Sequence, residues 1–134
     1  MRLDGIGIFV SDMKTMVDFY KNILGFEIEW DGKASNVMLK KDGTLFMFYG
    51  RNDFEKMTNK RFNYANGING HYEIALSVSK YSDVDLVYAD LISKGAESVM
   101  EPTTEPWGQR TCYIADPEGN LIEIGSFNEW IVIY

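Results

Sequence analysis

Two glutamates, Glu73 and Glu123, are the residues of this 134-residue chain best suited by type and spacing to do chemistry. Each lies in an otherwise apolar stretch whose side chains alternate in character, as they do in a β-strand. Carboxylates that face a cavity can transfer a proton or bind a cation. The alternative interpretation, which fits most glutamates, is that both lie hydrated at the rim of a sheet or pair with Lys or Arg.

The elements that must position these carboxylates can be predicted from the residues that begin and end helices, strands and turns. In the first half, alternation over residues 5–10 predicts a strand, Ser11-Asp12 predicts a helix cap, and apolar residues recur at helical spacing from Met13 to Leu24. Gly25 supplies the left-handed residue that ends such a helix. Three further strands are expected, with a turn at 41–43 before the last of them: Phe26 to Trp30, Asn36 to Lys40 and Thr44 to Tyr49.

The second half repeats this order of elements. We expect a strand from His71 to Ser79, a helix cap at Ser82, a helix from Asp83 to Ser93 and a stop at Gly95. Three strands should follow, the last two flanking the turn sequence Asp-Pro-Glu-Gly at 116–119: Glu97 to Met100, Arg110 to Ala115 and Leu121 to Gly125. The residues at 43–47 align with those at 119–123, which indicates an internal repeat.

The repeat predicts an α+β fold of two β-α-β-β-β modules whose concave sheets enclose a small-molecule pocket. Module one covers about residues 1–50, a polar linker or mobile lid about 51–70, and module two about 71–126. The tail covers residues 127–134, and its last five residues, from Trp130 to Tyr134, are aromatic or β-branched. We expect it to dock on its own sheet or, alternatively, to add to the edge of a partner subunit.

Strand alternation also predicts which side chains face the pocket. Ile6, Ile8 and Val10 should pack on the first helix, which leaves Gly5, Gly7 and Phe9 on the other face. The same parity sends Met47, Tyr49, His71, Glu73 and Glu123 to that second face, with the small residues Ala75 and Ser77. By the repeat, Gly5 corresponds to Glu73 and Met47 to Glu123, so these four positions define the predicted site.

Composition excludes several classes of function. The formal net charge is -7, so the field around the chain repels nucleic acid and anionic membrane surfaces. No apolar run approaches the roughly 20 residues of a membrane span. The lone cysteine, Cys112, cannot form an internal disulfide and predicts a reducing, cytoplasmic location, and with His71 as the only histidine there is no zinc-site cluster.

Four stretches of the sequence are similar to the vicinal oxygen chelate superfamily, which includes glyoxalase I, bleomycin-resistance proteins and extradiol dioxygenases. They are Phe9-Val10-Ser11-Asp12-Met13, the run from Asp18 to Phe26, Pro106-Trp107-Gly108-Gln109-Arg110, and the run from Asp116 to Glu123. The resemblance spans nearly the whole chain. It implies curved mixed sheets around a concave pocket and a twofold homodimer.

In the metal-dependent members of that superfamily, the four innermost strand positions carry His or Glu ligands to a divalent metal. Gly5 and Met47 depart from this pattern, Glu73 stands where a histidine is common, and only Glu123 keeps a family ligand type. No full four-ligand site can be built from glycine and a thioether. A reduced site would use Glu73 and Glu123, assisted by His71, to hold Mg²⁺, Mn²⁺, Ni²⁺ or Zn²⁺.

Three functions follow as hypotheses. The first is a binding protein without a metal or other cofactor that sequesters an aromatic or cationic small molecule, with Trp30 among the candidate stacking surfaces. The second is a metal-dependent lyase or isomerase resembling glyoxalase I, in which Glu73 or Glu123 moves the proton. The third is a role exerted mainly through dimerisation. The predicted ligand-binding residues are Gly5, Gly7, Met47, Tyr49, His71, Trp107, Arg110 and Tyr113.

Overall fold

A computed structural model describes residues 1–127 of the chain and divides it into two compact units, Met1–Tyr64 and Ala65 onward. Apart from Phe127, the predicted docking of the tail lies outside the described residues. None of the helices within residues 1–127 combines the length and apolar character needed to cross a membrane. The two units are unit 1 and unit 2 below.

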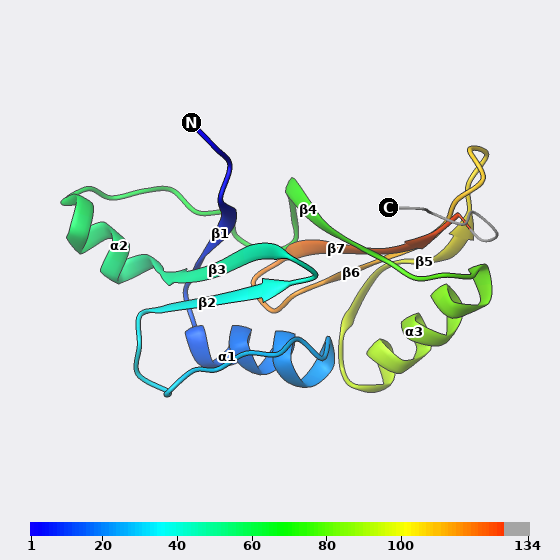
Figure 1. Ribbon diagram of the computed structural model, residues 1–134, viewed down its shortest axis with the longest axis horizontal. Helices are drawn as coiled ribbons and strands as arrows, with labels where there is room; N and C mark the ends of the chain where they lie inside the picture. The colour runs from blue at the N-terminus through cyan, green and yellow to red at the C-terminus, as the bar shows by residue number, and fades with distance from the viewer. Residues whose placement is uncertain (128–134) are drawn as a thin grey trace. The chain divides into compact units, whose positions relative to one another are not determined.

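Unit 1 is built on a three-stranded sheet in the order β1-β3-β2. The pairing of β1 with β3 is parallel and that of β2 with β3 is antiparallel. Helix α1, which continues as a π-helical turn η1, packs on one face of this sheet, and α2 follows β3 (Figure 1). The bounds are β1 Gly5–Val10, α1 Met13–Asp18, η1 Phe19–Ile23, β2 Asn36–Lys41, β3 Thr44–Gly50 and α2 Arg51–Thr58.

The first helix begins and ends where the sequence predicts. The Asp12 carboxylate accepts a hydrogen bond from the Thr15 amide at 3.1 Å, which satisfies an amide that the helix itself leaves unpaired. Gly25 has a φ of 77°, a left-handed conformation that favours glycine. Between these ends the helix buries Met16 and Tyr20 completely, and Tyr20 meets Phe48 edge to face with ring centroids 5.0 Å apart.

Unit 2 is built on a four-stranded sheet in the order β4-β7-β6-β5. The pairing of β4 with β7 is parallel and the other two are antiparallel. Helix α3 packs on one face of this sheet (Figure 1). The bounds are β4 Asn69–Ser77, α3 Tyr81–Ser93, β5 Glu97–Thr104, β6 Arg110–Ala115 and β7 Asn120–Ser126.

The two sheets share a strand order and a register, so the α+β architecture of the prediction is confirmed. In each unit the first strand lies parallel to the last strand, which in turn pairs antiparallel with the strand before it. Gly5 pairs with Leu45 and Gly7 with Met47 in unit 1, just as Glu73 pairs with Leu121 and Ala75 with Glu123 in unit 2. The alignment of the two halves drawn from the sequence therefore follows the actual strand pairing.

Residues 26–30 are not a strand, contrary to the prediction. Phe26 and Ile28 are buried and Glu27 and Glu29 are exposed, so the alternation that favoured a strand is real. The segment does not pair with the sheet, however. Among the described residues, no strand of unit 1 occupies the edge position that β5 occupies in unit 2. Alternation reports which side chains are buried and not whether the backbone is paired.

The linker prediction for residues 51–70 missed α2 altogether. No α2 residue is buried and Gly50 offers no capping side chain, so the segment lacks the apolar period and the cap that reveal most helices. Helix α3 begins at Tyr81 rather than Asp83, because the Asp83 carboxylate accepts a hydrogen bond from the Lys80 amide at 3.1 Å and so caps the earlier turn. Ser82 therefore lies inside the helix.

Two strand predictions need smaller corrections. Strand β5 continues to Thr104, well past the expected end at Met100, and its register shifts accommodate Pro102. Ile6, expected to pack on the first helix, is instead 51% exposed. Ile8 and Val10 are buried as expected.

The turn between β6 and β7 fastens the start of β4 to the sheet. The buried Asp116 carboxylate accepts hydrogen bonds from the Glu118 amide at 2.9 Å and from the amide and side chain of Asn120 at 3.0 and 2.8 Å. The Gly119 carbonyl accepts from the Asn69 amide at 3.0 Å. Gly119 has a φ of 89°, and a Cβ there would lie 2.0 Å from the Gly67 carbonyl oxygen. Only glycine fits at position 119, where the chain passes close to the backbone of Gly67.

Gly119→Ala should therefore destabilise the protein by more than about 2 kcal/mol, because it adds a backbone clash to the cost of a left-handed alanine. Gly95→Ala is the matched control, since Gly95 has a φ of 100° but a Cβ added there would meet nothing within 4 Å. That control should lose only about 1 kcal/mol. Urea unfolding measures both free energies, and equal losses would show that the Gly67 contact does not constrain the turn.

Candidate functional site

The face of the unit 2 sheet that points away from α3 carries a cluster of polar side chains. The residues that alternate with them, Cys112, Ile114, Ile122 and Ile124, are fully or almost fully buried on the α3 side. The cluster is named the acidic face below. Its members are Glu73 on β4, Thr111 and Tyr113 on β6, and Glu123 on β7.

The Tyr113 hydroxyl is the centre of the acidic face. It donates to Glu123 Oε2 at 3.0 Å, and the negative charge of Glu73 also raises the pKa of this hydroxyl. A phenol has one hydrogen, so it can donate to only one of the two carboxylates at a time. The Thr111 hydroxyl donates to the same Glu123 oxygen at 3.0 Å. The two glutamates of the prediction thus lie on one face of the sheet with Tyr113, which is hydrogen-bonded to Glu123.

The environment of Tyr113 keeps it protonated. Loss of hydration on burial raises the pKa of its phenol, and the hydrogen bonds and negative charges of Glu73 and Glu123 raise that pKa further. Thr111 is buried, Tyr113 and Glu123 are half-buried, and Glu73 is exposed. The acidic face therefore presents carboxylate oxygens to solvent above neutral hydroxyl donors.

Trp107 lies on the loop between β5 and β6 and is linked to the sheet through Gln109. Its indole Nε1 donates to the Gln109 side-chain oxygen at 3.0 Å, and the indole is 65% exposed. The Gln109 amide nitrogen lies over Gly125, only 2.7 Å from where a Cβ would be, so Gly125 makes room for it. The loop is closed by the Glu105 amide, which donates to the Gln109 carbonyl at 2.7 Å, and by Tyr81, which donates to the Gly108 carbonyl.

Thr111 and Gln109 were missed by the sequence prediction. Gln109 immediately precedes β6, and Thr111 and Tyr113 lie within it, so these three side chains are spaced to point to the same face. Strand parity applied to this segment would have found both Gln109 and Thr111. The prediction used parity only on the strands that carry Gly5, Glu73, Met47 and Glu123. The signal was present and lay in the periodicity of residues 109, 111 and 113.

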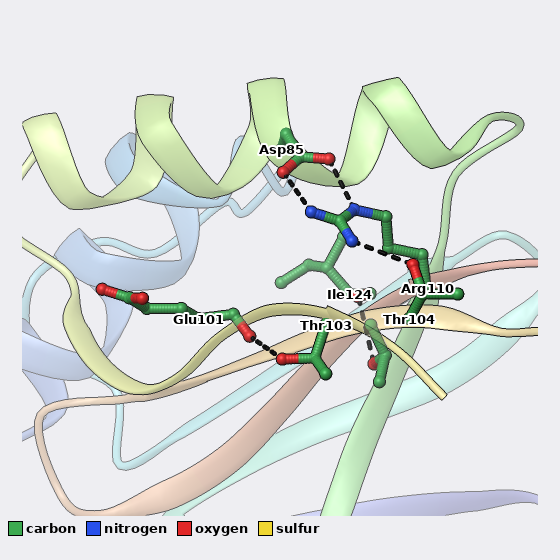
Figure 2. A network of polar contacts seen from close by, with 7 residues as sticks. Asp85, Glu101, Thr103, Thr104, Arg110 and Ile124 are labelled. Atoms are coloured by element: carbon green, nitrogen blue, oxygen red, sulfur yellow. Dashed lines mark hydrogen bonds and ion pairs between the residues drawn. The ribbon is translucent and has the colours of Figure 1, made fainter. Parts of the chain in front are cut away.

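Arg110 faces α3 and not the acidic face. Its guanidinium makes a two-pronged ion pair with Asp85 on α3, with both N–O distances 2.7 Å, and donates to the Thr104 hydroxyl at 2.9 Å (Figure 2). The guanidinium lowers the pKa of the Asp85 carboxyl. Cys112 lies on this side too, where burial raises the pKa of its thiol to about 11. Such a thiol is not a nucleophile at neutral pH.

The predicted site residues of unit 1 lie on the open face of their own sheet. A Cβ at Gly5 would lie 2.8 Å from the Leu45 carbonyl oxygen, so the space at Gly5 is filled by the neighbouring strand. At Gly7 the nearest atom is the Met47 methyl group at 3.6 Å, which is an ordinary contact. Tyr49 packs with Phe54 edge to face at 5.7 Å and donates to the Met57 sulfur at 3.6 Å.

The side chains at the predicted positions do not fit a divalent metal. Residues 1–127 contain no group of three or more His, Cys, Asp or Glu side chains that could hold an ion. His71 is exposed, next to a shift in the β4 register, and Glu123 Oε2 already accepts two hydroxyl hydrogen bonds. Gly5 and Met47 supply no oxygen or nitrogen side-chain donor. What remains is a pair of carboxylates with neutral donors.

Because the pKa of Tyr113 is raised above its ordinary value of 10.0, the stability that it contributes is complete below pH 10 and is lost as pH rises further. Between pH 9 and pH 11 the free energy of unfolding should therefore fall less in Tyr113→Phe than in the wild type. The difference between the two decreases should be about 1 kcal/mol after allowance for solvent screening. Urea unfolding at the two pH values measures this difference. The other titrating groups cancel because both proteins share them, and parallel losses would contradict the assignment.

Comparison with known proteins agrees with this architecture. The model of the Glyoxalase/Bleomycin resistance protein/Dioxygenase superfamily matches residues 2–124. The uncharacterized protein YraH of Bacillus subtilis (strain 168) is 29% identical over 127 residues, which cover 92% of this chain and 97% of YraH.

Solved structures show the same fold. A glyoxalase/bleomycin resistance protein/dioxygenase from Nocardioides superposes with a TM-score of 0.80 at 19% identity, covering 97% of this chain and 86% of its own. A lactoylglutathione lyase from Agrobacterium tumefaciens gives 0.72 at 17% identity, with 93% and 92% covered. Since the family model spans nearly all of the sequence, the chain belongs to the Glyoxalase/Bleomycin resistance protein/Dioxygenase superfamily.

Proposed function

We propose that this protein binds a small aromatic cation on its acidic face and sequesters it without a metal cofactor. The observation that carries the proposal is the placement of Glu73 and Glu123 on one face of the sheet with Tyr113, whose hydroxyl donates to Glu123 at 3.0 Å. This arrangement concentrates two carboxylates on one face of a sheet, and within residues 1–127 neither of them forms an ion pair with a Lys, Arg or His side chain. Such a site attracts a positive charge.

The surroundings of the cluster favour a ligand that is flat as well as cationic. Trp107 presents an exposed indole, and its hydrogen bond to Gln109 limits the orientations that the ring can take. An indole face attracts a cation by about 0.5 to 2 kcal/mol, depending on its exposure. Tyr113 stays protonated, so it can direct Glu123 without adding a charge of its own. Glu73 is the more exposed of the two glutamates, so its side chain can turn toward a ligand.

The alternative is a metal-dependent lyase or isomerase that resembles glyoxalase I and uses Glu73 or Glu123 to move a proton. The donor set argues against it, because two hydroxyls already engage one oxygen of Glu123 and no group of three or more His, Cys, Asp or Glu side chains within residues 1–127 could hold an ion. The similarity to a lactoylglutathione lyase, at 17% identity, reflects the fold. We therefore place binding ahead of catalysis.

The proposal includes a homodimer and a cytoplasmic location. Paired modules of this fold suit twofold assembly, in which one patch meets its own copy. The single Cys112 is buried and free, which suits a reducing compartment. The net charge of -7 keeps nucleic acid out of the list of proposed partners.

A fluorescence titration with proflavine, a flat aromatic cation, tests the binding proposal. Glu123→Gln preserves the shape of the side chain and removes its charge, so the affinity should fall about tenfold or more. Trp107→Leu should weaken binding about threefold to tenfold, because it removes the cation–π contact. The anionic dye 1-anilinonaphthalene-8-sulfonate should bind none of these proteins at the acidic face.

Asp90→Asn is the matched control for this titration. Asp90 pairs with Lys94 on α3, on the opposite side of the sheet from the acidic face, so its loss should change proflavine affinity less than twofold. Equal weakening by Asp90→Asn and Glu123→Gln would mean that only the net charge of the protein attracts the dye. The absence of saturable binding by the wild type would refute the proposal.

Calorimetry with Mn²⁺, Ni²⁺ and Zn²⁺ separates the binding protein from the metal-dependent enzyme. We expect no heat that depends on Glu123, because the available donors do not complete a coordination shell. The comparison is between the wild type and Glu123→Gln under the same conditions. A stoichiometric heat that disappears in the variant would favour the enzyme over the binding protein.

A further inference from the structure

A second polar site lies in unit 1, on helix α2 and the segment that follows it. Here a surface hollow of about 550 Å³ is lined by Asn52, Glu55, Lys56, Asn59, Lys60 and Arg61, which together are named the basic hollow. That volume is within the range of about 300 to 1,000 Å³ typical of small-molecule sites. The hollow shares no residue with the acidic face of unit 2.

The basic hollow is formed by one face of α2. Its helical members, at positions 52, 55 and 56, follow the i, i+3, i+4 spacing that places side chains on one side of a helix, and Asn59 follows as the residue that ends the helix. The other side of α2 packs on aromatic residues, where the rings of Phe54 and Phe9 lie 4.3 Å apart. Helix α2 is thus held to unit 1 by one face and presents the other to solvent.

A tight reversal brings Lys60 and Arg61 back beside that face. Asn59 adopts a left-handed conformation with a φ of 53°, and the Lys60 amide donates to the Glu55 carbonyl at 3.3 Å. Beyond the reversal, Glu55 Oε2 accepts from the Phe62 amide at 2.9 Å and from the Tyr64 hydroxyl at 3.2 Å. These bonds fasten the returning chain to α2 and fix the shape of the hollow.

The hollow gathers three cations that have no carboxylate partner among the described residues. Across residues 1–127, Arg2, Lys14, Lys41, Lys94 and Arg110 each form an ion pair with an aspartate. Lys56, Lys60 and Arg61 form no ion pair within the same range. The one carboxylate in the hollow, Glu55, is engaged by the Phe62 amide and Tyr64. A protein with a net charge of -7 thus has a local excess of cations here.

We propose that the basic hollow binds a multivalent oxyanion, of the kind carried by a phosphorylated metabolite. Two lysines and an arginine supply positive charge, and the guanidinium of Arg61 can bind two oxygens of one phosphate group at once. Asn52 and Asn59 add neutral amide donors at the same face. The volume accommodates a group larger than a single phosphate ion, which favours a diphosphate or a phosphate with an organic part.

Inorganic pyrophosphate is the probe, and calorimetry at low ionic strength is the measurement. The wild type should bind one pyrophosphate saturably, with an affinity that falls as salt rises. Lys60→Gln/Arg61→Gln should weaken binding about a hundredfold, since each charged contact contributes about tenfold. Malonate, tested in parallel, distinguishes a site for any dianion from one that is specific for phosphate. Binding of pyrophosphate supports the proposal whether malonate also binds or not.

Lys21→Gln/Lys33→Gln is the matched control, because it removes the same charge from exposed positions of unit 1 outside the hollow. It should change pyrophosphate affinity less than twofold. Thermal unfolding of both double variants verifies that each is folded, as expected for exposed side chains. The proposal is overturned if the wild type shows no saturable heat, or if both variants weaken binding equally. The cations would then serve only to stabilise the C-terminal end of α2.

Discussion

The parallel pairing of β4 with β7 is the constraint on which the rest of unit 2 depends. It places Glu73 beside Leu121 and Ala75 beside Glu123, and so sets the spacing between the two carboxylates. Because strands far apart in the sequence do not pair by local folding, the pairing needs an anchor. The buried Asp116 turn and the crossing of Gly67 and Gly119 provide one at the end of the sheet next to the acidic face. The turn at residues 116–119 thus also helps to hold the strands that carry the acidic face.

Much of this arrangement was predictable from the sequence, since it follows from side-chain periodicity and turn chemistry. The register that joins Gly7 to Met47 and Ala75 to Glu123 is the one that the internal repeat implies. The cap at Asp12 and the stop at Gly95 are local signals that the tertiary structure does not override. Fold class was accessible because many independent local signals agreed with one another.

Other features were not accessible, for two physical reasons. Strand pairing depends on a partner, so the alternating residues 26–30 could satisfy burial without joining the ladder. Helix α2 buries no residue and is held by ring contacts and by the bonds to Glu55, which single-sequence periodicity cannot reveal. The role of Arg110 depended on knowing that Asp85 would lie opposite it on α3. In each case the deciding interaction joins residues that are distant in sequence or lack a periodic signal.

The neutral donors of the acidic face determine what kind of ligand we propose for it. A divalent cation would cancel the charge of two carboxylates, whereas the hydroxyls of Thr111 and Tyr113 orient Glu123 without cancelling any charge. The proposed ligand would then have to supply the positive charge itself, and an oxyanion substrate would be repelled. The oxyanion that we propose for the basic hollow would meet Lys56, Lys60 and Arg61 instead, in the other unit of the chain. The chemistry of each site thus follows from the charges that its neighbours leave uncompensated.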